Sequence, residues 1–144
     1  MENLTSYYKK LQETYSKLES LTKKLEEISH QTSTLQNLND EDPRLMYQDA
    51  LVWRFKFSCN LTCKYFEQYL FTRYGIKTNS PRSIFKELHK QRLITESEKK
   101  LLITVIADKS NADRTYNEII VDALRIQISD HNATLKSLSN RFAP

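Results

Sequence analysis

Apolar residues recur every seven positions through the first 35 residues of the chain. One heptad position holds leucine throughout, at Leu4, Leu11, Leu18 and Leu25. The other position is mostly apolar and holds Tyr7, Thr14, Leu21 and Ile28. Lysine and glutamate fill many positions between them, so the pattern predicts a long amphipathic helix. Such a seam suits a dimerising coiled coil as well as a helical bundle, but the helices predicted further along the chain favour the bundle.

A second helix is predicted from Pro43 to about Arg73. Asp42 has the character of an N-cap, Pro43 fits the first helical position, and Gly75 fits a left-handed C-cap. The segment is unusually aromatic, and its rings are Tyr47, Trp53, Phe55, Phe57, Tyr65, Phe66, Tyr69 and Phe71. We therefore expect other elements to flank this helix on more than one side.

Three further helices follow from similar boundary signals. Ser80-Pro81 opens a short helix over about 81–90, whose inward residues are Ile84, Phe85 and Leu88. A capping box at 95–98 opens a fourth helix that fades near 108, and its apolar residues are Leu101, Leu102, Val105 and Ile106. The last helix is predicted over about 113–138, with apolar positions at Tyr116, Ile119, Ile120, Ala123, Leu124, Ile128 and Leu135. Residues 139–144 are expected to fray.

These elements predict an all-α protein, an up-and-down four- to five-helix bundle with one short extra helix, in a single domain over residues 1–144. The composition agrees, because the 144 residues include one glycine and three prolines. Collagen-like chains and all-β folds need more of these turn residues. One glycine also cannot build the multi-glycine loops that cradle phosphates.

The formal net charge is +4, and the excess lies in residues 76–144, which carry twelve Lys or Arg against eight Asp or Glu. This excess permits an anionic partner such as RNA, although a solvated mixed-charge surface gives the same count. Cys59 and Cys63 lie four apart, which predicts two small buried thiols on one helix face and no metal site. No signal peptide and no run of about 20 apolar residues is found, so we expect a cytoplasmic protein without a membrane partner.

The segment 108–118 concentrates polar chemistry between the last two long helices. Its candidate phosphate ligands are Lys109 and Arg114, and Tyr116 or Asn117 could contact a sugar or a base. The alternative is a charged loop in which Asp113 caps the last helix. The residues by themselves leave both interpretations open. The three histidines are interpreted as surface residues: His30 and His89 at helix ends, and His131 on an exposed turn.

Three sequence pieces carry a family resemblance. They are Arg54-Phe55-Lys56-Phe57, Ser80-Pro81-Arg82-Ser83-Ile84-Phe85, and residues 108–118, which end in Thr-Tyr-Asn-Glu. From about 45 to 128 the chain resembles the nucleotidyltransferase substrate-binding proteins, a branch of the HEPN helical-bundle superfamily. The first helix fits this family in pattern alone.

The resemblance implies a non-catalytic subunit that works with a separately encoded minimal nucleotidyltransferase. ATP and Mg²⁺ would be held by that partner, and this chain would bind no cofactor itself. Tyr116 matches a tyrosine that receives AMP in related toxin–antitoxin pairs. Lys109, Arg114, Asn117 and Arg54 would bind ligand or phosphate, and Asp108, Asp113 and Glu118 would support the loop. A homodimer, or a 2:2 heterotetramer with the transferase, is the implied assembly.

The chain departs from the family pattern at the positions of its ribonuclease members. Those members use an arginine and, after four to six intervening residues, a histidine, where this chain has Lys109 and Arg114. Arginine stays protonated and cannot act as a base, so binding without cleavage is expected. Family acids and a tryptophan are replaced by Lys56, Asn60 and Cys63. An HEPN-type ribonuclease toxin and a helical scaffold without a ligand remain the alternatives. The Arg82/His89 and Arg125/His131 pairs also fit the spacing rule, and we attribute them to chance.

Overall fold

The computed structural model describes residues 3–31, 43–112 and 121–144. These ranges contain five helices and no strand: α1 (Leu4–Gln31), α2 (Pro43–Tyr74), α3 (Pro81–Lys90), α4 (Glu96–Asn111) and α5 (Val121–Asn140). The predicted all-α bundle with one short helix is therefore confirmed. Within the same ranges, none of the helices has the length and apolarity needed to cross a membrane.

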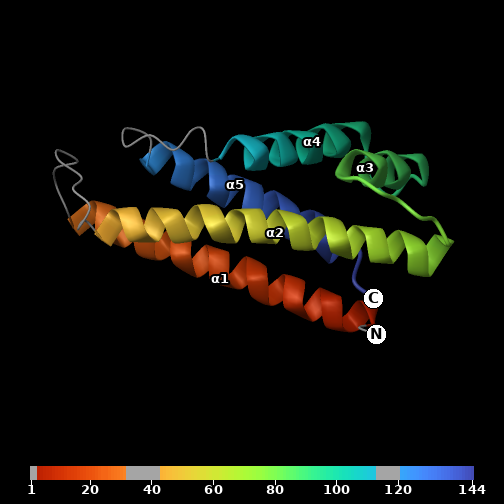
Figure 1. Ribbon diagram of the computed structural model, residues 1–144, viewed down its shortest axis with the longest axis horizontal. Helices are drawn as coiled ribbons and strands as arrows, with labels where there is room; N and C mark the ends of the chain where they lie inside the picture. The colour runs from red at the N-terminus through yellow and green to blue at the C-terminus, as the bar shows by residue number, and fades with distance from the viewer. Residues whose placement is uncertain (1–2, 32–42, 113–120) are drawn as a thin grey trace.

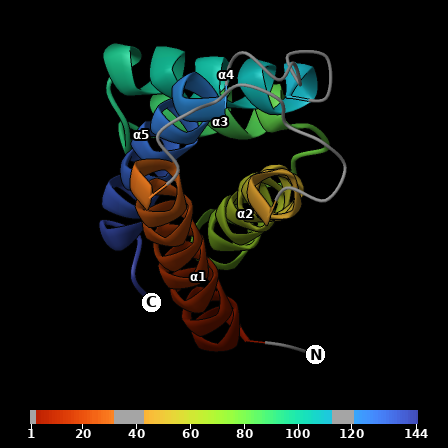
Figure 2. The same ribbon diagram turned by 90° about the vertical axis from the view of Figure 1, so that its left-hand side faces the viewer.

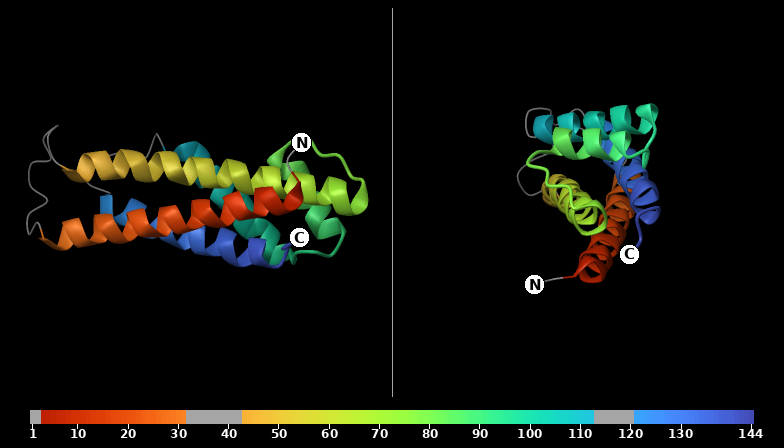
Figure 3. Two further views of the ribbon diagram at one scale, coloured as in Figure 1. Left: turned by 90° about the horizontal axis from the view of Figure 1, so that it is seen from below. Right: turned by 90° about the vertical axis from the view of Figure 1, so that its right-hand side faces the viewer.

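The long helix α2 lies at the centre of the arrangement (Figure 1). On one side of α2, helices α1 and α5 pack against it and against each other, and on the other side α3 and α4 pack as a pair. Figure 2 shows these two groups in a view from one end of the bundle. The start of α1 and the C-terminal residues lie at the same end of the bundle (Figure 3). There the Tyr8 hydroxyl of α1 donates a hydrogen bond to Asn140 Oδ1 at 3.2 Å.

The helix boundaries that the described residues include follow the predicted capping chemistry. Ser80 and Thr95 cap α3 and α4, and each takes part in a reciprocal capping box with the residue three positions later. Gly75 ends α2 with a φ of +67°, in the left-handed region that favours glycine. The Ile76 N–H then donates to the Leu70 carbonyl at 3.3 Å, which satisfies a carbonyl at the helix end. Asp42 lies outside the described residues.

The core of α1 differs in part from the heptad prediction. Leu11, Leu18 and Leu25 are fully buried as expected, but the second buried column holds Tyr15 and Thr22. The second column that the heptads predict is only half-buried, and its residues are Tyr7, Thr14, Leu21 and Ile28. The reason is that α1 contacts both α2 and α5, so it buries a wider stripe than a two-helix seam requires.

Tyr15 joins three helices through its hydroxyl. Its oxygen lies 2.6 Å from Thr62 Oγ1 of α2 and 2.8 Å from Ser139 Oγ of α5. Because the ring is completely buried, desolvation raises the pKa of this phenol above its ordinary range. The contact fixes the relative register of α1, α2 and α5.

Several predicted inward positions prove to be on the surface. Leu101 is 51% exposed, whereas its neighbours Leu102 and Val105 fill the core as expected and Ile106 is half-buried. Ala123 of α5 is exposed, while Ile128 and Leu135 are buried. Trp53, Phe57 and Phe71 of the aromatic helix α2 are also exposed, although α2 contacts all four other helices. Contacts on several sides of a long helix do not cover its whole circumference. Tyr116, Ile119 and Ile120 lie outside the described residues.

The chain after Ser139 does not fray as predicted. Phe142 is 2% exposed and packs edge-on against the rings of Phe66 and Tyr69, with 5.2 Å between ring centroids in each pair. The Tyr65 hydroxyl donates to the carbonyl of Phe142. The aromatic contact with α2 and the Tyr65 hydrogen bond anchor the end of the chain, because together they offset part of the entropy cost of ordering these residues.

Candidate functional site

The end of α4 is held against α2 by a cationic side chain. Lys109, in the last turn of α4, donates from Nζ to Asn60 Oδ1 at 2.9 Å. Lys109 is half-buried, and Asn60 is exposed on α2. From the sequence, Asn60 is a departure from the family pattern. In the structure, Asn60 positions Lys109, which is one of the residues predicted to bind phosphate.

Asp108, the residue before Lys109, is held from α5. Its Oδ2 lies 2.7 Å from His131 Nε2 and 3.1 Å from Gln127 Nε2, which donates to it. Because an ionised carboxylate can only accept, the imidazole donates from Nε2. The His131 ring also stacks on Phe55 of α2, at 5.8 Å between centroids and 18° between planes. Asp108 is thus held by two residues of α5, and the stacking of His131 on Phe55 links this pair to α2.

His131 was predicted to lie on an exposed turn, and this prediction is wrong. The residue lies within α5, and its side chain is 16% exposed. A signal for this placement was present in the sequence, because His131 follows Ile128 by three positions and precedes Leu135 by four. That spacing puts the three side chains on one helix face.

The two thiols lie beside Lys109. Cys59 is buried, Cys63 is half-buried, and both are free, which confirms the predicted burial for Cys59 and in part for Cys63. Burial raises the pKa of Cys59 to about 12 and that of Cys63 to about 11, and the nearby Lys109 ammonium offsets only part of the rise. Thiols with raised pKa values are poor nucleophiles, so they serve packing here.

An exposed aromatic pair lies on α2, on the helix face that also carries Asn60. Trp53 is 62% exposed and Phe57 is 45% exposed, and their rings stack with 5.5 Å between centroids and 9° between planes. Asn60 lies seven positions after Trp53 and therefore shares its face of α2. The face thus combines two exposed rings with the Asn60–Lys109 hydrogen bond.

Of the remaining predicted site residues, the structure describes only Arg54, and Arg54 does not join this cluster. Asp113, Arg114, Tyr116, Asn117 and Glu118 lie outside the described residues. Arg54 faces α1, where it lines a groove with residues of that helix. The six positions between Arg54 and Asn60 correspond to about 240° around α2, so these two residues point to different sides.

The discounted arginine–histidine pairs form no joint site. Arg125 is paired with Glu26 of α1 at 3.8 Å, whereas His131 is paired with Asp108. His89 lies 3.3 Å from Glu96 Oε2 at the start of α4. Among the residues that the structure describes, no group of three or more His, Cys, Asp or Glu side chains is arranged to hold a metal ion.

Asp108→Ala should lower the free energy of unfolding by about 1–3 kcal/mol, because it leaves the His131 and Gln127 donors without their acceptor. Chemical denaturation at neutral pH measures this loss. Asp130→Ala is the matched control, since Asp130 is an exposed aspartate of α5, and its loss should stay within about 0.5 kcal/mol. Equal losses in the two variants would contradict a specific role for Asp108.

The fold is that of an all-α helical bundle whose fourth helix ends on a polar cluster held by its neighbours. The model of the family described as "Nucleotidyltransferase substrate binding protein like" matches residues 4–143. The chain belongs to this family, and the resemblance found in the sequence is confirmed. The match includes the first helix, where the sequence comparison rested on pattern alone.

A solved structure supports the fold. A crystal structure of a protein from Thermus thermophilus superposes with a TM-score of 0.62. The two chains are 22% identical, and the match covers 88% of this chain and 99% of the other. No curated protein matches this chain at a significant level.

Proposed function

We propose that this protein is the non-catalytic subunit of a two-component system whose catalytic half is a minimal nucleotidyltransferase. The observation that carries the proposal is the family match over residues 4–143, since the family is described by substrate binding for such enzymes. The chemistry of the chain supports it. The chain's one glycine is the C-cap of α2, so a nucleotide cradle built on several glycines must come from another protein.

The geometry at the end of α4 fits a segment that is presented to a partner. Asp108 and Lys109 are tethered to α5 and α2, and they lie immediately before the segment that carries Arg114 and Tyr116. Preorganised attachment points reduce the entropy lost when a segment is engaged by a partner. The exposed Trp53–Phe57 pair on the same side supplies apolar area of the kind that interfaces use.

In the complete system, ATP and Mg²⁺ bind to the transferase, and Tyr116 receives AMP. The tyrosine oxygen attacks the α-phosphorus of ATP, pyrophosphate leaves, and the hydroxyl proton passes to solvent. Lys109 and Arg114 hold phosphate oxygens during this step. Such a protein would act as the modified member of a toxin–antitoxin pair in the cytoplasm, as a homodimer or as a 2:2 heterotetramer with the transferase.

The test is mass spectrometry of the full chain after incubation with its co-purified transferase, ATP and Mg²⁺. We expect one AMP adduct, on the peptide that contains Tyr116, and none on Tyr116→Phe. Tyr74→Phe is the matched control, because Tyr74 is an exposed tyrosine at the end of α2. An adduct that persists on Tyr116→Phe would disprove the tyrosine assignment, and failure to bind any such transferase would disprove the partnership.

A ribonuclease is the second candidate, and one observation favours it. The motif histidine is missing, but His131 pairs with Asp108 at 2.7 Å beside Lys109, as a general base pairs with the group that orients it. RNA cleavage by the purified chain that is lost in both His131→Asn and Lys109→Ala would establish this activity. If the RNA substrate stays intact, the ribonuclease function is ruled out and the substrate-binding role remains.

A further inference from the structure

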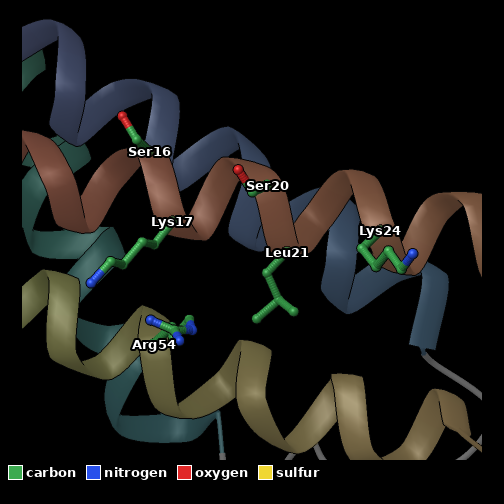
Figure 4. A pocket seen from close by; sticks show the side chains of 6 residues that line it. All are labelled: Ser16, Lys17, Ser20, Leu21, Lys24 and Arg54. Carbon is green, nitrogen blue, oxygen red and sulfur yellow. The ribbon is translucent and has the colours of Figure 1, made fainter.

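A basic groove runs between α1 and α2, on the side of α2 away from α4. Its volume is about 520 Å³, and it is lined by Ser16, Lys17, Ser20, Leu21, Lys24 and Arg54 (Figure 4). Lys17 and Arg54 extend toward one another across the gap between the two helices, and Leu21 points into the gap. Lys24 lies further along α1.

The charge of this groove has one sign. Three of its lining residues are cationic, and no carboxylate lies among the described residues that line it. Two acids of α1 are directed elsewhere, since Glu19 is paired with Lys136 at 2.8 Å and Glu26 with Arg125 at 3.8 Å, both on α5. Glu19 and Glu26 are thus engaged with α5, whereas Lys17 and Lys24 line the groove beside α2.

The spacing of the cations suits an anion with more than one charge. Lys17 and Lys24 are seven residues apart, which places them on one face of α1 about 10 Å apart along the axis. Lys17 and Arg54 can grip one phosphate from both sides, and the guanidinium can do so with two parallel hydrogen bonds. Lys24 is then placed for a second phosphate along the groove.

We propose that this groove binds an anion with closely spaced phosphate groups, either the polyphosphate of a free nucleotide or the backbone of a nucleic acid strand. Leu21 supplies an apolar wall beside the charges. The same charges disfavour a polycationic ligand, because none of the described lining residues offers a carboxylate to pair with it. This inference goes beyond the proposed function, since it concerns another face of the molecule and does not require the transferase.

The test is titration calorimetry of the full chain alone with inorganic tripolyphosphate. We expect binding that weakens as salt is raised, and that falls by about tenfold or more in the Lys17→Gln/Arg54→Gln variant, because two charge-assisted contacts are lost together. The matched control is Lys9→Gln/Arg73→Gln, which removes two exposed cations from the same two helices and should retain affinity within about twofold.

Two results would overturn the proposal. One is the absence of tripolyphosphate binding by the unmodified chain, and the other is an equal loss of affinity in the groove variant and the control variant. Competition with a short single-stranded RNA lacking a 5′-triphosphate distinguishes the two sources. Displacement of tripolyphosphate by this RNA identifies a nucleic acid backbone as the natural ligand, and failure to displace it identifies a free nucleotide. The titration and the competition both use this chain alone, so their outcomes do not depend on whether a transferase partner exists.

Discussion

Phe142→Ala should lower the free energy of unfolding by about 3–5 kcal/mol, the range measured when a buried aromatic ring is replaced by a methyl group. The Phe142 ring is 2% exposed and packs edge-on against Phe66 and Tyr69 of α2. Its removal loses the transfer free energy of the ring and leaves a cavity beside two other rings. Denaturation in urea, followed by far-ultraviolet circular dichroism, measures the change in the midpoint of unfolding.

Deletion of Ala143 and Pro144 is the control for this substitution. Both residues are exposed, so their removal should change the stability by less than about 0.5 kcal/mol. If Phe142→Ala is as stable as this shortened chain, the aromatic contact does not hold the C-terminal segment in solution. A loss in the predicted range would establish the end of the chain as part of the core.

Alkaline pH should destabilise the protein through Cys59 and Cys63. The ordinary thiol pKa is 9.0, and burial raises it to about 12 for Cys59 and to about 11 for Cys63 in the folded protein. Between these values the unfolded chain releases protons that the folded chain retains, so stability is complete below pH 9 and falls as the pH rises. At about pH 10.5 each thiol accounts for a loss of about 2 kcal/mol.

The measurement compares the slope of stability against pH in the unmodified chain and in Cys59→Ala/Cys63→Ala. Groups remote from the two thiols are present in both proteins and cancel in the comparison. The variant has a different stability at neutral pH because two side chains are shortened. Between pH 8 and about pH 10.5, its free energy of unfolding should fall by about 4 kcal/mol less than that of the unmodified chain. Parallel slopes would show that the thiols titrate normally and are not shielded from water.

The helix boundaries were predictable because their causes are local. Ser80, Thr95 and Gly75 act on backbone groups within a few residues, so a short stretch of sequence contains both the capping residue and its target. The burial of Leu11 and of Phe85 was predictable for a similar reason, since the period of apolar positions marks one helix face.

The sequence could not predict positions whose environment depends on distant helices. Tyr15 is buried because Thr62 and Ser139 meet its hydroxyl, and these residues follow it by 47 and 124 positions. Phe142 is ordered by rings of α2, which no property of the last six residues indicates. His131 was assigned to an exposed turn, although its helical spacing from buried neighbours was visible in the sequence.

The candidate site was predictable in composition more than in geometry. Lys109 and Asp108 were singled out from the clustering of charges, and the structure places both at the tethered end of α4. Their partners Asn60 and His131 come from α2 and α5, and only the fold brings these helices to α4. Arg54 was grouped with Lys109 through the family resemblance, but its position around α2 directs it to the groove beside α1.

The position of the start of α1 and the C-terminal residues at the same end of the bundle has a practical consequence for protein engineering. Helix α5 has 20 residues, so its start is about 30 Å from its C-terminal end. An affinity tag, a fluorescent protein or a surface-coupling group attached to either end would thus sit a full helix length from the start of α5 (Figure 1). A short peptide that connects the two ends would also permit circular permutation, with new ends opened in the turn between α3 and α4.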